Sequence, residues 1–171
     1  AQAMIINSGN ANAVTGEEGY EDAIRMAAAV SKRMNIEEKH VLVASTGVIG
    51  ERLPIEKIVG NVDRLIEGLS EGGIPYAEEG IMTTDKFPKT EFRKCSIGGR
   101  EITVGGIAKG AGMIEPNMAT MLSFIMTDAA VSHDCLNNVF REVIAESFNA
   151  ITVDGCMSTN DTVIILANGI A

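Results

Sequence analysis

The sequence predicts a layered α/β protein with a mixed sheet. Short apolar runs at residues 4–7, 41–44 and 162–167 have the length and hydrophobicity of buried strands. Segments with apolar residues at helical spacing lie between them. The dipeptide Gly98–Gly99 separates two further strand-like runs, which is typical of an antiparallel hairpin. Because this hairpin interrupts the alternation of strands and helices, we expect a mixed sheet rather than a doubly wound parallel one.

The first half of the chain is expected to hold two helices and two buried strands, over 4–7 and 41–44. Helical spacing predicts a helix over 20–34 and a second helix that begins near Pro54 and continues to Leu69, where EGGIP ends it. The strand over 41–44 runs into the small-residue segment STGVIG. A short apolar element is expected near 76–82.

The second half is expected to be richer in strands. The expected elements, in order, are strands over 92–97 and 100–107, a glycine-rich loop GGIAKGAG (105–112), a strand over 120–127, a helix that ends at Phe148, a polar turn over 152–161 and a strand over 162–167. Either Ser132 or Asp134 is expected to cap the helix. The apolar positions of this helix, all expected to be buried, are Leu136, Val139, Phe140, Val143, Ile144 and Phe148.

The composition disfavours nucleic-acid-binding, membrane-binding and metal-binding functions. The net charge of −9 and the pI near 4.7 give a surface that repels phosphate backbones and anionic lipid, so we expect neither nucleic acid nor membrane as a partner. The three cysteines have no metal-like spacing and the chain has only two histidines, so no metal site is expected. Three unpaired thiols are typical of a reducing compartment, which favours a cytoplasmic location.

The two ends of the sequence suggest a piece of a longer protein. The chain starts without Met inside an apolar run, and it stops a few residues after its last strand. Strands this apolar need neighbours on both faces. We therefore expect residues 1–171 to be a single-domain segment of a longer precursor.

Thr120 lies at the mouth of a predicted strand, in the stretch PNMATMLS (116–123). One interpretation is that it only starts the strand. The other is that the Ala119–Thr120 bond is cut, so that Thr120 becomes an N-terminus. Its new α-amine, with a pKa of about 7.7–8.0, takes the proton from its own hydroxyl, and one residue then supplies both nucleophile and base.

Two other segments carry candidate chemistry. In STGVIG (45–50), small residues let a hydroxyl and a backbone N–H approach a reacting carbonyl, as in an oxyanion hole; a tight turn into the next helix is the alternative. Lys109 is the only cation in GGIAKGAG, and it either is solvated or meets a substrate carboxylate. That loop lacks the spacing of a phosphate-binding P-loop. Asp154 and Asp161 lie in a turn without EF-hand spacing, which favours a hydrogen-bonded turn over a cation site.

Five stretches together resemble the ornithine acetyltransferase family, also called glutamate N-acetyltransferase, of arginine biosynthesis. In the family's order they are NSGNANAVTG (7–16), STGVIG (45–50), MTTDKFPK (82–89), GGIAKGAGMIEPNMATML (105–122) and TVDGCMSTNDTV (152–163). Val14 departs from the family pattern, in which Cys is common, and so does the Cys156–Met157 pair. The resemblance implies a layered α/β/β/α arrangement like that of N-terminal-nucleophile proteins, with a distinct connectivity.

The resemblance also implies a mechanism and an assembly. The chain would cut itself at Ala119–Thr120, giving an α chain that contains 1–119 and a β chain that starts with 120–171, and these would assemble as α2β2. Thr120 would take the acetyl group of N-acetylornithine and pass it to glutamate.

Roles for particular residues follow from the same resemblance. Thr46, through its hydroxyl, and Gly47, through its backbone N–H, match the family's oxyanion stabilisers. Thr83 and Lys109 match substrate-binding positions, and Thr83 is preferred to Thr84. No cofactor is implied, although acetyl-CoA as a second acetyl donor stays open.

Two other hypotheses compete with this one. The first is an N-terminal-nucleophile aminopeptidase or amidohydrolase of related architecture, in which water replaces glutamate as the acceptor. The second is a non-enzymatic α/β domain in which Thr120 merely opens a strand. Transfer of acetyl to glutamate separates the first from an acetyltransferase, and an intact Ala119–Thr120 bond favours the second.

Overall fold

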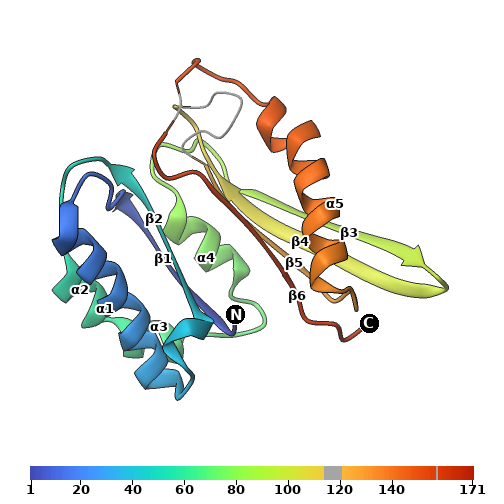
Figure 1. Cartoon of the computed structure of the whole chain (residues 1–171), viewed down its shortest axis with the longest axis horizontal. Helices are drawn as coiled ribbons and strands as arrows, with labels where there is room; N and C mark the ends of the chain where they lie inside the picture. The colour runs from blue at the N-terminus through green and yellow to red at the C-terminus, as the bar shows by residue number, and fades with distance from the viewer. Residues whose placement is uncertain (114–120, 157) are drawn as a thin grey trace. The chain divides into compact units, whose positions relative to one another are not determined.

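The chain folds as two units, Ala1–Thr83 and Thr84–Ala171, and each is described by itself. Figure 1 shows the computed structural model, which describes residues 1–113, 121–156 and 158–171. No helix in these ranges is both long enough and apolar enough to span a lipid bilayer. The expected cut between Ala119 and Thr120 lies outside the described residues.

A pair of parallel strands forms the centre of the first unit. Strand β1 (Ala3–Asn10) pairs with β2 (Val41–Val48), in a register that runs from Ala3 opposite Val41 to Asn10 opposite Val48. Parallel neighbours need a long crossover, and α1 (Gly16–Met34) supplies it, followed by the short 3-10 helix η1 (Glu38–His40).

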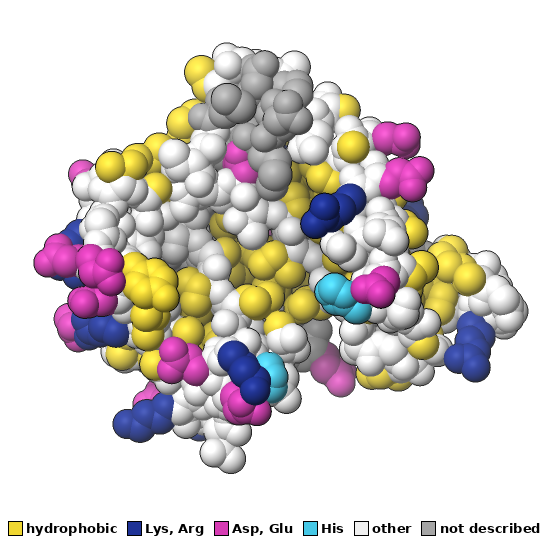
Figure 2. Space-filling view, viewed as in Figure 1, with side chains coloured by type: hydrophobic (Ala, Val, Ile, Leu, Met, Phe, Trp, Pro, Cys, Tyr) yellow, Lys and Arg dark blue, Asp and Glu magenta, His cyan; other side chains and the backbone are white. Residues whose placement is uncertain are grey.

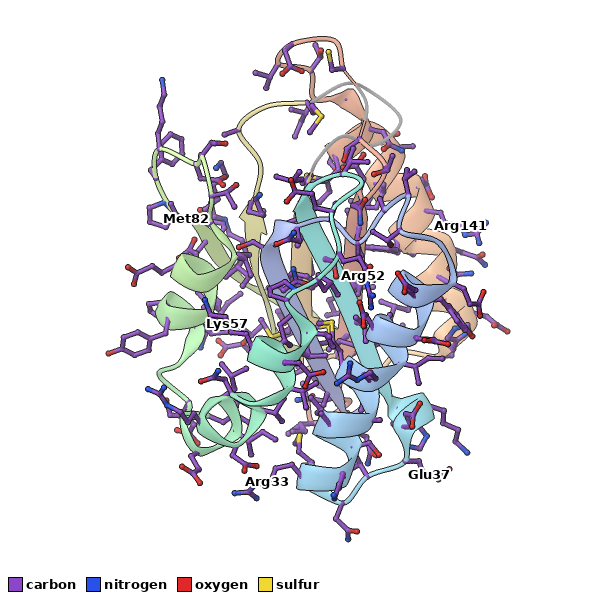
Figure 3. All side chains as sticks on the ribbon, turned by 90° about the vertical axis from the view of Figure 1, so that its left-hand side faces the viewer. Arg33, Glu37, Arg52, Lys57, Met82 and Arg141 are labelled. Carbon is purple, nitrogen blue, oxygen red and sulfur yellow. The ribbon has the colours of Figure 1, made fainter. Side chains whose placement is uncertain are left out.

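Helices cover both faces of this strand pair. Figure 1 shows α1, α2 (Ile55–Val59) and α3 (Val62–Glu67) on one side of the strands and α4 (Ile74–Ile81) on the other, where α4 contacts β1. Arg33, labelled in Figure 3, joins α1 to α3 through a 2.9 Å contact with Asp63. The buried core of the unit consists of Ile5, Met26, Ala27, Val30, Val41, Leu53, Ile55 and Val62.

The single helix expected between Pro54 and Leu69 is wrong, because the structure has two short helices there. The break falls at Gly60–Asn61, where the backbone N–H of Asn61 donates to Ile58 at 3.1 Å instead of continuing the α-helical pattern. Glycine costs about 1 kcal/mol relative to alanine inside a helix. The apolar spacing continues across the break because each of the two short helices packs an apolar face against the same core.

The second unit contains the mixed sheet that the sequence predicts. Its strands are β3 (Lys89–Ile97), β4 (Arg100–Lys109), β5 (Leu122–Thr127) and β6 (Thr162–Ala167), in the order β3-β4-β5-β6. The pairs β3–β4 and β4–β5 are antiparallel, and β5–β6 is parallel. The hairpin turn lies at Gly98–Gly99 as predicted, and both glycines have positive φ. The fold class is therefore mixed α/β.

The strand predicted over 100–107 is confirmed and extends to Lys109, so it takes up most of the glycine-rich segment that was also described as a loop. Residues Gly105 to Lys109 belong to β4. A Cβ atom on Gly105 would meet the Phe92 ring at 2.1 Å, and one on Gly106 would meet the Phe124 carbonyl oxygen at 2.9 Å. These glycines thus admit close neighbours inside a sheet, and their number in the sequence does not indicate an open loop.

Helix α5 (His133–Glu146) connects β5 to β6 and is followed by the 3-10 helix η2 (Phe148–Ala150). Ser132 caps it, because its hydroxyl accepts from the backbone N–H of Cys135 at 3.4 Å. The expected burial of its apolar face is wrong. Val139 and Val143 are each 52% exposed, and no residue of the helix is fully buried. Figure 2 shows that apolar side chains reach the surface in several places.

Candidate active site

The end of β2 holds the first two predicted site residues, Thr46 and Gly47. The sequence left open whether they lie in a turn, and the structure places both inside the strand. Thr46 is completely buried, and its Oγ1 has no hydrogen-bond partner among the described residues. Burying a hydroxyl without a hydrogen-bond partner lowers the stability of the fold by about 1–3 kcal/mol. Such a hydroxyl is therefore a candidate for binding a ligand or a reacting group.

Gly47 has a conformation that other residues rarely adopt, with φ at +134°. Its partner in the parallel ladder is Gly9, whose φ is +109°. A Cβ on Gly47 would lie 2.2 Å from the carbonyl carbon of Gly9, so the two backbones approach each other as only glycine allows. The peptide unit that follows Thr46 is therefore held in one orientation.

Contacts from the loop after β1 fix this end of the strand. The backbone N–H of Ala11 donates to Val48 at 2.9 Å, and that of Gly50 donates to Ala13 at 2.9 Å. Arg52, labelled in Figure 3, binds the buried carboxylate of Asp22 on α1 at 3.0 Å. Backbone hydrogen bonds from the NSGNANAVTG stretch thus hold the end of the strand that carries Thr46.

Lys109, the third predicted site residue, is the last residue of β4 and is only 3% exposed, which excludes the solvated alternative. Burial lowers the pKa of its ammonium below the usual value, repulsion from Lys89 lowers it further, and attraction from Asp85 raises it. A buried cation of this kind is suited to binding one carboxylate in a site that excludes water.

Thr83 is exposed and follows Met82, which Figure 3 labels at the end of α4. It is the last residue of the first unit. Ala119 and Thr120 lie outside the described residues. The structure therefore brings Thr46 and Gly47 together as neighbours on one strand and places Lys109 in the second unit.

The polar turn before β6 forms the hydrogen-bonded turn that the sequence favoured. Asp154 accepts from the backbone N–H of Met113 at 2.7 Å, and Asp161 accepts from that of Met121 at 2.7 Å. Burial raises the pKa of Asp161, while backbone donors from Met121 and Ser158 lower it. Asp161 thus ties the residue that follows Thr120 to the start of β6.

Sequence reasoning missed Asp85. It lies in the stretch MTTDKFPK, directly after the two threonines considered as substrate-binding residues. Its carboxylate contacts Lys89 and Gly110, the latter 25 residues away. The second unit has a pocket of ≈ 470 Å³ on its sheet, bordered by Lys89, Ile125 and Phe148. None of the predicted site residues lines this pocket, so it gives no support to the predicted site.

The mixed sheet and the parallel strand pair define a mixed α/β protein, and the solved structures that it resembles have folds of the N-terminal-nucleophile type. One is the arginine biosynthesis bifunctional protein ArgJ of Bacillus halodurans (TM-score 0.60, 44% identity, 68% of this chain and 61% of that chain). Another is ornithine acetyltransferase of Mycobacterium tuberculosis complexed with ornithine (TM-score 0.58, 37% identity, 67% and 61%).

The sequence comparison gives the family. The ArgJ family model matches residues 1–171, and the chain belongs to that family. The arginine biosynthesis bifunctional protein ArgJ of Geobacter sulfurreducens is 55% identical over 170 residues, which are 99% of this chain and 43% of the relative. That of Thermotoga neapolitana is 54% identical over 170 residues, with the same coverage. The chain therefore spans less than half the length of these curated relatives.

Proposed function

We propose that this chain is the nucleophile-bearing part of an acetyltransferase that moves the acetyl group of N-acetylornithine to glutamate in arginine biosynthesis. The protein first cuts its own Ala119–Thr120 bond. The two products stay together as α and β chains and pair into α2β2 in the cytoplasm. Family membership and the match to an ornithine acetyltransferase crystallised with ornithine support this proposal.

The proposed reaction has two halves, with a covalent intermediate between them. The α-amine of Thr120 accepts the proton of its own hydroxyl, and Oγ attacks the acetyl carbonyl of N-acetylornithine. The tetrahedral intermediate collapses, ornithine leaves with the proton returned to its amine, and an acetyl ester remains on Thr120. The amine of glutamate then attacks this ester, and the threonine hydroxyl is restored.

The observation that carries the proposal is the buried Thr46 hydroxyl. Its Oγ1 has no partner among the described residues, so its proton is available to an oxyanion that forms during acyl transfer. The neighbouring N–H of Gly47 is the second proposed donor. Loss of one oxyanion donor typically costs about 3–4 kcal/mol of transition-state stabilisation, which makes Thr46 a decisive residue.

Lys109 and Thr83 are the proposed substrate-binding residues. N-acetylornithine and glutamate share an α-carboxylate, and a buried ammonium such as that of Lys109 matches it in charge. Thr83 supplies a hydroxyl from its exposed position after α4. We propose no metal and no bound cofactor for this chemistry. Acetyl-CoA as a second acetyl donor is tested separately, with labelled acetyl-CoA and glutamate.

The competing hypothesis of an aminopeptidase or amidohydrolase shares the nucleophile and differs in the acceptor. The relatives reported above are named as arginine-biosynthesis proteins, which favours transfer to an amino acid over hydrolysis. An assay for acetylglutamate against free acetate, with N-acetylornithine as donor, separates the two hypotheses directly.

The test of the proposal is an intact-mass measurement on the full-length protein under denaturing conditions, before and after incubation with N-acetylornithine. We expect two fragments that break at Ala119–Thr120, and we expect the Thr120 fragment to gain one acetyl group. Thr120→Ala is the matched control and should remain a single uncut chain without acetyl. A wild-type chain that stays whole and gains no acetyl would refute the proposal and leave Thr120 as the start of a strand.

A further inference from the structure

Among the ion pairs described in the second unit, that of Asp85 has the most completely buried carboxylate. Its side chain is 0% exposed, and it lies just before β3. Its Oδ1 accepts from the ammonium of Lys89 at 2.7 Å and from the backbone N–H of Gly110 at 2.7 Å. A carboxylate taken out of water needs such donors, since burying it without them is costly.

The contact with Gly110 reaches the end of β4. Gly110 follows Lys109 directly, so its N–H belongs to the peptide bond between the two residues. The hydrogen bond from this N–H to Asp85 fixes that peptide plane and with it the last residue of the strand. The side chain of Lys109 therefore starts from a backbone position that Asp85 helps to set.

The charge of Lys109 also depends on Asp85. Burial and the repulsion from Lys89 both lower the pKa of Lys109, and Asp85 is the anion that raises it. Asp85 therefore acts on the end of β4 in two ways, through its hydrogen bond with the Gly110 backbone and through its negative charge near Lys109.

We propose that Asp85 is a positioning residue for amino-acid binding: it fixes the end of β4 through Gly110 and supplies a negative charge near the Lys109 ammonium that meets the α-carboxylate of the substrate. This inference rests on the proposed function, because it takes Lys109 as the carboxylate ligand. It assigns to the aspartate of MTTDKFPK a role that the threonines beside it do not have.

Asp85→Asn in the full-length protein is the first test. Asparagine keeps the volume and an acceptor for the Gly110 N–H but removes the charge. We expect KM for N-acetylornithine and for glutamate to rise about tenfold near neutral pH, which corresponds to about 1.4 kcal/mol. We expect kcat to change little, because the lost interaction is made equally in the ground state and the transition state.

The pH dependence gives a readout that a merely structural role would not move. In wild type, we expect KM to rise with pH as Lys109 loses its proton. In Asp85→Asn this rise should begin at lower pH. In Lys89→Met it should begin at higher pH, because the repulsion is gone while the attraction from Asp85 remains. The carbon-13 shift of the Lys109 Cε, titrated without substrate, should move in the same two opposite directions.

Asp128→Asn is the matched control. Asp128 also accepts from a backbone N–H of β4, that of Thr103 at 2.8 Å, but it does not act on Lys109. We expect this variant to leave both the KM profile and the Lys109 titration as in wild type.

The outcomes separate the two proposals. An unshifted Lys109 titration in Asp85→Asn, an unchanged KM, or shifts of the same sign in Asp85→Asn and Lys89→Met would each overturn the inference. Wild-type protein that moves no acetyl group would instead refute the proposed function. The titration needs no activity, so it still decides whether Asp85 controls the charge of Lys109.

Discussion

Replacing Gly47 by alanine tests the close approach of β1 and β2 beside Thr46. In the structure, the new Cβ would lie 2.2 Å from the carbonyl carbon of Gly9, 2.3 Å from its oxygen and 2.6 Å from the backbone nitrogen of Asn10. All three atoms are backbone, so no side chain can swing aside to make room. Either β1 moves away from β2 or the strand around Thr46 shifts.

The expected cost has two parts. A non-glycine residue at a φ of +134° stores about 1–3 kcal/mol of backbone strain. Overpacking against a rigid neighbour adds about 1–3 kcal/mol. We therefore expect Gly47→Ala to lower the free energy of unfolding by about 4 kcal/mol, a large share of the about 5–15 kcal/mol that holds a typical protein folded.

Gly9→Ala is the matched control, because Gly9 has a φ of +109° but nothing within 4 Å of its Cβ position. This variant should show only the strain of about 1–3 kcal/mol. Urea unfolding followed by far-ultraviolet circular dichroism measures both, and the chain has no tryptophan to follow instead. Equal losses of stability in the two variants would refute the argument, since the steric contact would then contribute nothing.

Three further substitutions follow from the structure. Thr46→Val removes a buried hydroxyl that has no described partner, so the free energy of unfolding should stay the same or rise by about 1 kcal/mol. The kcat for acetyl transfer should fall about 10²–10³-fold. A loss of stability that parallels the loss of activity would contradict this prediction. Asp161→Asn keeps an acceptor for the Met121 N–H and removes a carboxylate whose pKa is raised by burial in the folded state. The stability of the variant relative to wild type should therefore be highest near neutral pH and should decline as the pH falls through the folded pKa of Asp161 toward 3.8, because wild type takes up the proton there. Urea titrations at several pH values measure this difference, and a pH-independent difference would count against the argument. Val14→Asn should raise the unfolding free energy by about 1 kcal/mol, because Val14 is 81% exposed and holds a φ of +59° that asparagine tolerates better; a lower melting temperature would show that Val14 makes contacts that matter.

Elements whose signal is local were predictable from the sequence. The hairpin at Gly98–Gly99, the last strand and the long helix after β1 are all confirmed, because a two-residue turn, an apolar run and helical spacing need no distant partner. The mixed character of the sheet followed from this hairpin together with the alternation of strands and helices that it interrupts.

Features set by distant backbones were not predictable. The strand predicted over 100–107 is confirmed, but nothing in the local sequence shows that the Phe92 ring and the neighbouring strand lie against Gly105 and Gly106. The burial of Val139 and Val143 was expected from helical spacing, but spacing identifies an apolar face without showing what covers it.

The candidate site divides in the same way. The small residues of STGVIG left an oxyanion hole and a tight turn both open, and the family resemblance named Thr46 and Gly47. The structure adds that the Thr46 hydroxyl is buried without a described partner. Asp85 gave no local sign, because its importance depends on Gly110 and Lys109, which only the sheet brings within its reach.

The order of strands in the second unit has a consequence for how self-cleavage would be detected. The proposed cut falls in the connection between β4 and β5, so β3 and β4 would belong to one product and β5 and β6 to the other. The ladder from Val104 opposite Thr127 to Lys109 opposite Leu122 crosses from one product to the other. A nick there would leave all of the described strand pairs in place, and each product would complete the sheet of the other. Native gel filtration should therefore give the same elution volume for nicked and intact molecules, and only denaturation should release the two pieces.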